Sequence, residues 1–167
     1  LDRLEPGNSA YHLGALHDIA SPIDPVAMAA AVNDVVRRQA SLRTVFREVD
    51  AEPVQVVRPY APVDVPVIDL SLLPTEEREV MLRQLTREEA ARPFDLATGP
   101  LFRAALIKLG EQRWRLLDTM HHIVGDGWSL GTFLADLHVA YAARAAGEAP
   151  LFRPLSLQFG QHAARER

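Results

Sequence analysis

The sequence predicts an α+β fold in which helices cover one face of a mixed β-sheet. Two observations support this prediction: β-prone runs recur along the whole chain, and two amphipathic helices are interleaved with them. The length of 167 residues is that of one domain, and a chain of this size loses roughly two-thirds of its unfolded surface on folding. We therefore expect a single domain with a sizeable core.

A strand followed by a helix opens the predicted fold. Residues 11–19 (YHLGALHDI) alternate loosely between apolar and polar side chains, as a strand does. Asp24 is suited to cap a helix N-terminus, and Pro25 is suited to its first position. The helix should run to about Gln39 and carry an apolar face made of Met28, Val32, Val35 and Val36.

Three further strands are expected next. Residues 42–49 and 53–57 form a predicted hairpin that turns at residues 50–52. Residues 63–70 are another candidate strand. Pro66 confines that strand to a sheet edge, because proline has no amide hydrogen to donate to a neighbour.

A polar helix, TEEREVMLRQLTREEA, is predicted to follow, with Thr75 as its cap. This sequence is about four turns long. Val80, Leu82 and Leu85 give the helix only a narrow apolar stripe, so we expect it to lie on the surface.

A second hairpin and a last helix complete the prediction. Residues 101–109 and 112–120 are β-prone runs separated by Gly110 and Glu111, which is the loop length of a two-residue hairpin. The helix that follows has apolar residues at the spacing i, i+3, i+4, i+7, and Gly147 is expected to end it. These apolar residues are Leu130, Phe133, Leu134, Leu137 and Tyr141.

Composition excludes several classes of protein. Acidic residues outnumber basic ones by 22 to 18 and the arginines are scattered, so we expect no nucleic-acid partner. The absence of cysteine excludes disulfides and thiolate chemistry. No apolar run approaches the ~20 residues that cross a bilayer, and no signal peptide opens the chain, so we expect no membrane partner and a cytoplasmic location. The chain begins at Leu1 rather than at methionine, and we expect it to be a segment of a longer polypeptide.

The segment MHHIVGDGWSL, residues 120–130, concentrates proton-holding groups where the predicted strand passes through a loop into the last helix. One interpretation is structural, because histidines at a strand end can be half-buried and hydrogen-bonded. A second is metal binding, since His122 and Asp126 have the i, i+4 spacing of ligands on a helix. Gly125 and Gly127 disfavour a helix there, and no third ligand is evident for a zinc site, which needs at least three.

A third interpretation is a serine hydrolase, because residues 127–131 match the pattern G-x-S-x-G. The acid and the histidine should then follow Ser129 in the chain. Asp136 and His138 lie on the helix that Ser129 would start, and His162 is almost at the end of the chain. Ser129 is more simply explained as a helix N-cap.

A histidine general base at the strand end is the fourth interpretation. The unperturbed pKa of histidine, ~6.5, allows it to accept a proton near neutral pH and release it again. Two adjacent histidines on a strand point to opposite faces, so only one of His121 and His122 can face a given substrate. The apolar period alone does not tell which one.

His121, His122, Asp126 and Gly127 fit the pattern H-H-x-x-x-D-G. The segment therefore resembles the signature of condensation domains of nonribosomal peptide synthetases, and of the wider chloramphenicol acetyltransferase-like acyltransferases. Trp128 and the serine after it are similar to the condensation form in particular.

Three other segments resemble motifs of the same family in the same order. Residues 38–46 (RQASLRTVF) are similar to R-H-E-x-L-R-T-x-F, with Gln39 and Ala40 in place of the histidine and the glutamate. Residues 93–109 (PFDLATGPLFRAALIKL) resemble F-D-L-x-x-G-P-L-x-R-x-x-L. Residues 159–167 (FGQHAARER) stand where the family has Y-x-D-Y-A-x-W and lack its tyrosines and tryptophan.

The resemblance implies a fold, a reaction and partners. Residues 1–167 would be the amino-terminal, chloramphenicol acetyltransferase-like subdomain of a condensation domain, with the carboxy-terminal condensation subdomain absent from this chain. Such domains form an amide by attack of an acceptor amine on a donor acyl thioester. Both substrates arrive on phosphopantetheine arms of donor and acceptor peptidyl carrier proteins, so no cofactor or metal is expected to bind directly. Neighbouring synthetase domains are further expected partners.

The resemblance also assigns roles to residues. It implies that His122 is the catalytic histidine and that His121 supports the loop. Asp126 would point away from the substrate into an ion pair, with Arg43 as its best partner. Gly127 would let a thioester carbonyl or a pantetheine arm approach its backbone. The face around His122 should expose apolar surface that the missing subdomain covers.

Two alternatives to the condensing enzyme stay open. One is a non-catalytic module that binds carrier proteins, against which the intact motif argues. The other is a different acyltransferase of this group, such as an epimerisation domain. A heterocyclisation domain would have aspartate at the position of His121, and Trp128 with Ser129 favours condensation over epimerisation.

Overall fold

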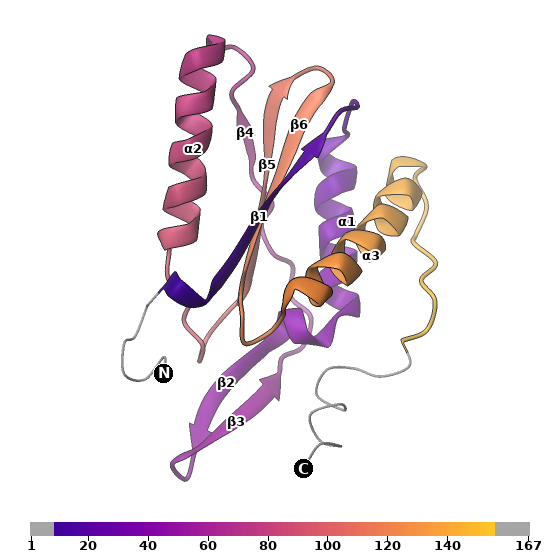
Figure 1. The fold of residues 1–167 in the computed structure, drawn as a ribbon. Helices are drawn as coiled ribbons and strands as arrows, with labels where there is room; N and C mark the ends of the chain where they lie inside the picture. The colour runs from indigo at the N-terminus through magenta and orange to yellow at the C-terminus, as the bar shows by residue number, and fades with distance from the viewer. Residues whose placement is uncertain (1–8, 156–167) are drawn as a thin grey trace.

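In the computed structural model, which describes residues 9–155, strands and helices follow one another in the predicted order (Figure 1). The elements are β1 (His12–Ile19), α1 (Pro25–Arg38), β2 (Thr44–Val49), β3 (Glu52–Val57), β4 (Val67–Asp69), α2 (Thr75–Ala91), β5 (Phe102–Gly110), β6 (Arg113–His121) and α3 (Gly127–Ala145). Short 3-10 turns at Ser9–Tyr11 and Ala40–Arg43 precede β1 and β2. The motif at residues 159–167 lies outside the described residues.

Four strands form a mixed sheet, as predicted. Their order is β1-β6-β5-β4; β6 is antiparallel to both of its neighbours, and β4 runs parallel to β5. Pro66 immediately precedes the edge strand β4, and its carbonyl accepts a hydrogen bond from the Leu106 amide at 2.8 Å. The register places His12 opposite His121. The start of β1 therefore lies beside the end of β6.

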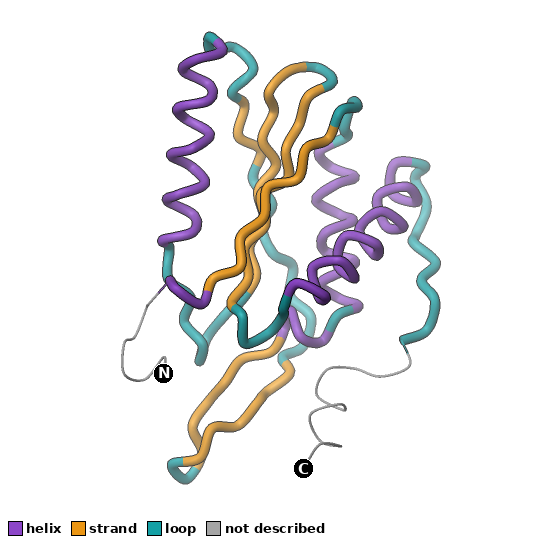
Figure 2. The backbone as a smooth tube through the Cα atoms, viewed as in Figure 1, coloured by secondary structure: helices purple, strands orange, loops and turns teal. Residues whose placement is uncertain are grey.

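Helices cover both faces of this sheet, so the prediction of one covered face is wrong (Figures 1 and 2). α1 and α3 pack on the face that carries Leu116, whereas Leu82 of α2 packs on the face that carries Leu117. The physical reason is the alternation of β6, which turns consecutive leucines to opposite faces. Both faces are therefore apolar, and each requires a cover.

The narrow apolar stripe of α2 is enough to pack the helix against the sheet. Leu82 is 3% exposed and Leu85 is partly buried, but Val80 is 56% exposed and lies outside the contact. α2 is thus a surface helix, as predicted, that contacts the sheet along a single line of side chains.

The predicted start of α1 and the predicted end of α3 are confirmed, whereas the predicted cap of α2 is corrected. The Asp24 carboxylate accepts hydrogen bonds from the amides of Val26 and Ala27, at 2.8 and 3.2 Å, and so caps α1. Gly147 follows α3 with φ of 76°, the left-handed conformation that glycine favours. Thr75 is the first residue of α2 rather than its cap. Pro74 holds the cap position, and its side chain has no acceptor to offer.

The predicted hairpin of β2 and β3 forms a separate two-stranded sheet at the bottom of Figure 1. Its turn residues Asp50 and Ala51 have φ of 52° and 64°. Two consecutive left-handed residues match the right-handed twist of the strands that they connect.

Two polar clusters hold α3 against α1. The Arg144 guanidinium donates to both carboxylate oxygens of Asp34, at 2.6 and 2.9 Å, and Asp34 is only 7% exposed. Nearer the start of α3, the Asp136 carboxylate accepts from Arg38 at 2.8 Å and from Gln39 at 2.6 Å. The middle and the C-terminal end of α3 are thereby tied to α1 and to the residue that follows it.

Candidate active site

The candidate site is the loop that leaves β6, a central strand, and enters α3. The His121 amide donates to the Leu101 carbonyl at 3.0 Å, and the His122 amide donates to the Tyr11 carbonyl at 2.8 Å. Leu101 precedes β5 and Tyr11 precedes β1, and these two strands flank β6. The amides of the two histidines are therefore held from opposite sides of β6. The backbone of the two histidines is thereby fixed although the strand ends there.

A tight turn follows immediately, and His121 holds it. The Val124 amide donates to the His121 carbonyl at 3.0 Å, and the Ile123 amide donates to Nδ1 of the His121 ring at 3.1 Å. An amide can only donate, so Nδ1 accepts and carries no proton, and a neutral His121 ring has its proton on Nε2. His122 is the next residue in this turn and is presented by it.

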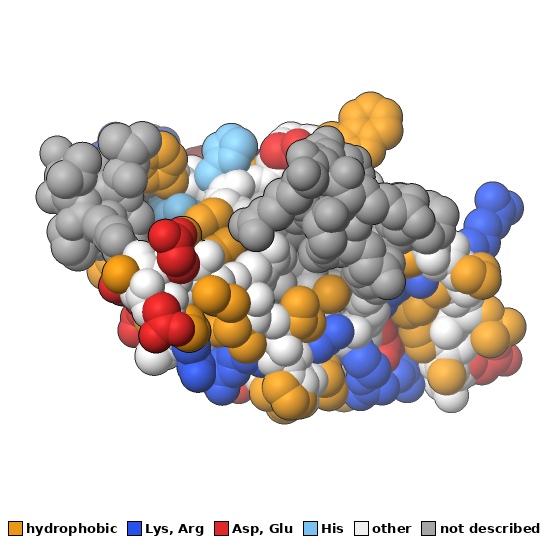
Figure 3. Space-filling model, turned by 90° about the horizontal axis from the view of Figure 1, so that it is seen from below, with side chains coloured by type: hydrophobic (Ala, Val, Ile, Leu, Met, Phe, Trp, Pro, Cys, Tyr) orange, Lys and Arg blue, Asp and Glu red, His pale blue; other side chains and the backbone are white. Residues whose placement is uncertain are grey.

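The two histidines occupy opposite environments, as strand alternation predicts. His121 is 5% exposed, whereas the His122 side chain is exposed. Viewed from the end of the sheet at which the loop lies, histidine side chains are visible at the surface beside hydrophobic ones (Figure 3). Of the pair, His122 is the residue that a substrate can reach.

Asp126 begins α3 and organises its first turn. Its carboxylate accepts from the amide and from the hydroxyl of Ser129, each at 2.8 Å. The Ser129 amide first, and then its hydroxyl, lower the pKa of the Asp126 carboxyl below its usual value. Asp126 is therefore the N-cap of α3, and the prediction that Ser129 is the cap is wrong, because Ser129 lies within the first turn of the helix.

The predicted ion pair between Asp126 and Arg43 is wrong for the described residues. The Arg43 guanidinium donates to backbone carbonyls instead: to Val36 at 3.1 Å, to Arg58 at 2.5 Å and to Arg37 at 3.4 Å. These contacts tie the turn after α1 to the end of β3. Arg43 thus stabilises the junction of α1 with the hairpin, while the Asp126 carboxylate is satisfied within its own helix turn.

The two glycines that flank Asp126 differ in their surroundings. A Cβ at Gly125 would lie 2.6 Å from Sδ of Met120 and 3.3 Å from Cβ of Ser129, so the loop passes tightly over the end of β6 there. A Cβ at Gly127 would meet no atom of the described residues within 4 Å, apart from its chain neighbours and the backbone of its own helix. The backbone of Gly127 is thus open to approach, which is what its predicted role requires.

Three aromatic rings surround the buried ring of His121. The centroids of Tyr11, His12 and Phe94 lie 6.2, 5.9 and 6.3 Å from its own. Sequence reasoning assigned no role to His12 and did not single out Phe94. The register of β1 against β6 brings His12 here, and Phe94 lies in the motif at residues 93–109, which was the available signal.

A buried acid lies on the opposite face of β6 from His121. Asp118 is 1% exposed, and its carboxylate is 2.6 Å from Nε2 of His17 on β1. Burial raises the pKa of Asp118 to about 6, although the adjacent His17 acts to lower it. Sequence reasoning missed this pair because its members are far apart in the chain and only strand pairing joins them.

The other interpretations of the loop can be compared with this geometry. The Ser129 hydroxyl is bound to Asp126, and Asp136 is bound to α1, so neither is arranged as in a hydrolase triad. In the described part of the chain, no three histidine, cysteine or acidic side chains gather closely enough to hold a metal ion. None of the helices within residues 9–155 is long and apolar enough to span a membrane.

Comparison with known proteins places these features in a family. The model of the family described as "Condensation domain" matches residues 1–167. A linear gramicidin synthase of Brevibacillus parabrevis is 38% identical over 167 residues, which are 100% of this chain and 2% of that protein. Phosphinothricin tripeptide synthetase PhsB of Streptomyces viridochromogenes is 42% identical over 168 residues, covering 99% of this chain and 14% of that protein.

Solved structures share the fold over the same extent. The starter condensation domain of rhizomide synthetase RzmA matches with a TM-score of 0.88 at 24% identity, over 99% of this chain and 39% of that one. The X-domain in its complex with OxyB from teicoplanin biosynthesis matches with a TM-score of 0.85 at 33% identity, over 98% of this chain and 34% of that one. The chain thus spans about a third of these solved chains and a small part of its curated relatives.

Proposed function

Because this chain belongs to the condensation-domain family, we propose that it supplies the catalytic histidine of a nonribosomal peptide synthetase domain that forms amide bonds. The observation that carries the proposal is the placement of His122. Its side chain is exposed at the end of a central strand, and its backbone is held from both sides and by the turn. A reactive group needs this combination of access and fixed position.

The proposed reaction joins two carrier-bound substrates. The acceptor amine attacks the carbonyl carbon of the donor thioester, so that a C–N bond forms and the C–S bond breaks. The amine loses one proton and the leaving thiolate takes one up, which balances the step. His122 is suited to hold the amine and to relay this proton, because histidine can both accept and donate near neutral pH.

The open backbone at Gly127 is the second element of the proposal. Since no side chain of the described residues, apart from its chain neighbours, lies within 4 Å of a Cβ placed there, a thioester carbonyl or a pantetheine arm can approach the first turn of α3. The partners would be a donor and an acceptor peptidyl carrier protein, and a carboxy-terminal subdomain would form the other wall of the site.

The test is amide formation by the full condensation domain that contains this chain. Donor and acceptor carriers are loaded, and the product is identified by mass spectrometry. We expect amide with the natural residue and a loss of at least about a hundredfold with His122→Ala, in the range that general base catalysis contributes. His138→Ala is the matched control, because His138 is another exposed histidine and lies in the middle of α3 rather than in the loop. An unchanged rate for His122→Ala would overturn the proposal.

A docking module is the second candidate function. The X-domain that this chain resembles at 33% identity was solved in complex with OxyB, so a protein similar to this one binds a partner. The two functions can be distinguished on the same full domain by measuring carrier binding beside amide formation. Binding of loaded carriers without any amide product would favour docking.

A further inference from the structure

We propose that Arg103 is a positioning residue of this site, which acts through Phe94 and His121 on the turn that presents His122. The proposal rests on the proposed function, because the reaction that it would affect is the one at His122.

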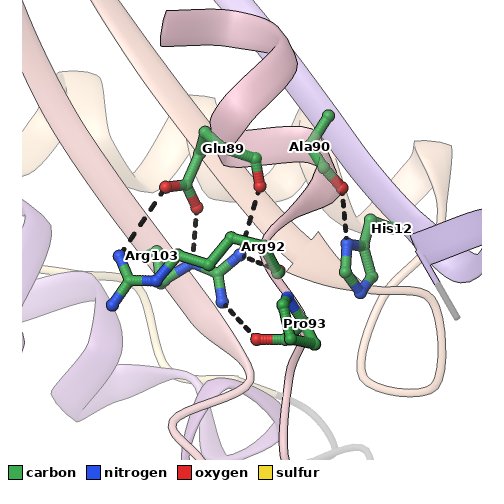
Figure 4. A network of polar contacts seen from close by, with 6 residues as sticks. All are labelled: His12, Glu89, Ala90, Arg92, Pro93 and Arg103. Atoms are coloured by element: carbon green, nitrogen blue, oxygen red, sulfur yellow. Dashed lines mark hydrogen bonds and ion pairs between the residues drawn. The ribbon is translucent and has the colours of Figure 1, made fainter. Parts of the chain in front are cut away.

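Arg103 joins β5 to the C-terminal end of α2 (Figure 4). Its Nε donates to the Glu89 carboxylate, and its Nη atoms donate to three carbonyls: Arg92 at 2.7 Å, Pro93 at 3.2 Å and Glu89 at 3.3 Å. The last turn of α2 contains no basic residue of its own. Arg103 thus supplies the positive charge and the donors that the end of a helix lacks.

The same guanidinium lies over the ring of Phe94. Its central carbon is 3.7 Å from the ring centroid, and Phe94 is 7% exposed. A cation held over the face of a buried ring attracts it, so Arg103 fixes the ring as well as the helix end. The position of Phe94 therefore depends on the four hydrogen bonds that hold Arg103.

Phe94 in turn contacts the two histidines at the strand ends. Its ring meets His12 edge to face at a centroid distance of 4.9 Å, and it meets His121 at 6.3 Å with an interplanar angle of 83°. His12 is itself anchored, because its Nδ1 donates to the Ala90 carbonyl of α2 at 2.8 Å. One side of the His121 ring is thereby set by groups that are tied to α2.

The last link is the turn itself. Nδ1 of His121 accepts from the Ile123 amide at 3.1 Å, so a rotation of this ring would disturb the backbone on the far side of His122. Misplacing a reacting group by about 1 Å can lower a rate by about a hundredfold. Arg103 touches no substrate in this scheme, and it acts only through the rings and the turn.

The test compares Arg103→Met and Arg103→Lys in the full condensation domain. Arg115→Met is the matched control, because Arg115 also pairs with a carboxylate, Asp18 at 2.6 Å, but at the other end of β6. We would measure kcat and KM for the loaded acceptor carrier, the melting temperature, and the ring Cε1 signals of selectively labelled histidines by NMR.

Arg103→Met should lower kcat roughly 10- to 100-fold, change KM less than about twofold and shift the ring signals of His121 and His122. Arg103→Lys should recover only part of kcat, because lysine keeps the charge but not the planar fork of donors. In a His122→Ala background, Arg103→Met should cause no further loss of rate, since both changes act on the same group. Arg115→Met should lower the melting temperature and leave kcat and the histidine ring signals unchanged.

The proposal would be overturned if Arg103→Met, like the control Arg115→Met, lowered the melting temperature without changing kcat or the histidine ring signals. If Arg103→Met does not fold, Phe94→Leu tests the next link with the same readouts and the same two outcomes. The NMR signals do not require turnover. If the domain without substitutions made no amide, the proposed function would be contradicted. The histidine ring signals would still show whether Arg103 acts on His121.

Discussion

His121 and His122 are adjacent in the chain, yet one is buried among aromatic rings and the other is exposed. The difference arises because β6 alternates its side chains up to its last residue, and the turn begins at once. The ring of His121 accepts a hydrogen bond from beyond His122. In the proposed function, His122 is thus the reactive residue and His121 is its support.

The first prediction separates the support of the loop from its chemistry. Asp126→Ala removes the acceptor of the Ser129 amide and should destabilise the full domain by about 1 kcal/mol, the usual cost of losing a helix cap. His122→Ala should leave the melting temperature nearly unchanged and abolish most amide formation. Thermal melts and the condensation assay on the same preparations measure both effects.

Asp126→Asn is the control, because asparagine keeps an acceptor oxygen and is an equally good cap. It should restore the stability that Asp126→Ala loses. Equal losses of stability for the His122 and Asp126 variants, with turnover unchanged for the former, would contradict the division of roles.

The second prediction concerns the pH dependence of stability. Because the pKa of Asp118 is raised to about 6 in the folded state, the folded state binds more protons than the unfolded state between about pH 4 and pH 6. The contribution of Asp118 to stability should therefore fall as the pH rises through this range, by on the order of 1–3 kcal/mol.

Asp118→Asn keeps the shape of the side chain and removes the titration. The difference in melting temperature, natural minus variant, should decrease from pH 4 to pH 7. A difference that stays constant or grows with pH would show that burial does not dominate at this carboxyl.

The loop lies between a strand and a helix, as the sequence predicts, but the partner of Asp126 and the cap of α3 were assigned wrongly. Strand alternation predicts that His121 and His122 point to opposite sides, but it does not tell which of them is exposed. The acceptors of Arg43 do not follow from any pattern, because the fold brings three backbone carbonyls within reach of its guanidinium. Which acceptor an arginine uses is decided by tertiary distances.

At the scale of elements, helix ends are where local chemistry decides most directly. Asp24 caps α1 through two amides, whereas the corresponding position of α2 is Pro74 and has no side-chain hydrogen bond. A helix that lacks a cap leaves its first amides to water.

The third prediction follows from this contrast. Asp24→Ala should lower the free energy of unfolding by about 1 kcal/mol, and Thr75→Ala should change it by less than about 0.5 kcal/mol. Urea unfolding followed by circular dichroism measures both. A larger loss for Thr75→Ala than for Asp24→Ala would mean that Thr75 caps α2 after all.

Within residues 9–155, the α-helices and strands were predicted in order, because periodicity and turn residues are local signals. The face of the sheet on which α2 lies was not predicted. Its side is set by how the chain crosses from β4 through α2 to β5, and by the apolar residues on both faces of β6. These are relations between distant segments, which no local pattern contains.

At the scale of the whole molecule, the face that carries the loop is not fully covered. Trp128, in the first turn of α3, is 86% exposed although it is a large apolar side chain. Exposed apolar surface beside a site is typical of a surface that meets a partner. The family's second subdomain is the partner that we propose.

The fourth prediction is that this segment alone forms no amide. An amine and a thioester must be held within about 3–3.5 Å of each other, and one wall of a site cannot hold two tethered substrates in that way. The measurement is condensation between loaded donor and acceptor carriers, run with residues 1–167 and with the full domain. A comparable rate for the two preparations would show that the site is complete within this chain.

The pairing of β1 with β6 also has a consequence for the synthesis of this protein on the ribosome. His12 meets His121, which leaves the ribosome more than a hundred residues later. At the ~5–20 residues per second of translation, β1 waits on the order of 5 to 20 seconds for the only strand that pairs with it in the described sheet. A ribosome that slows between the two strands should prolong this interval and leave the nascent β1 available to chaperones or to wrong partners. Synonymous codons in that stretch should therefore change the yield of folded protein without changing a single residue.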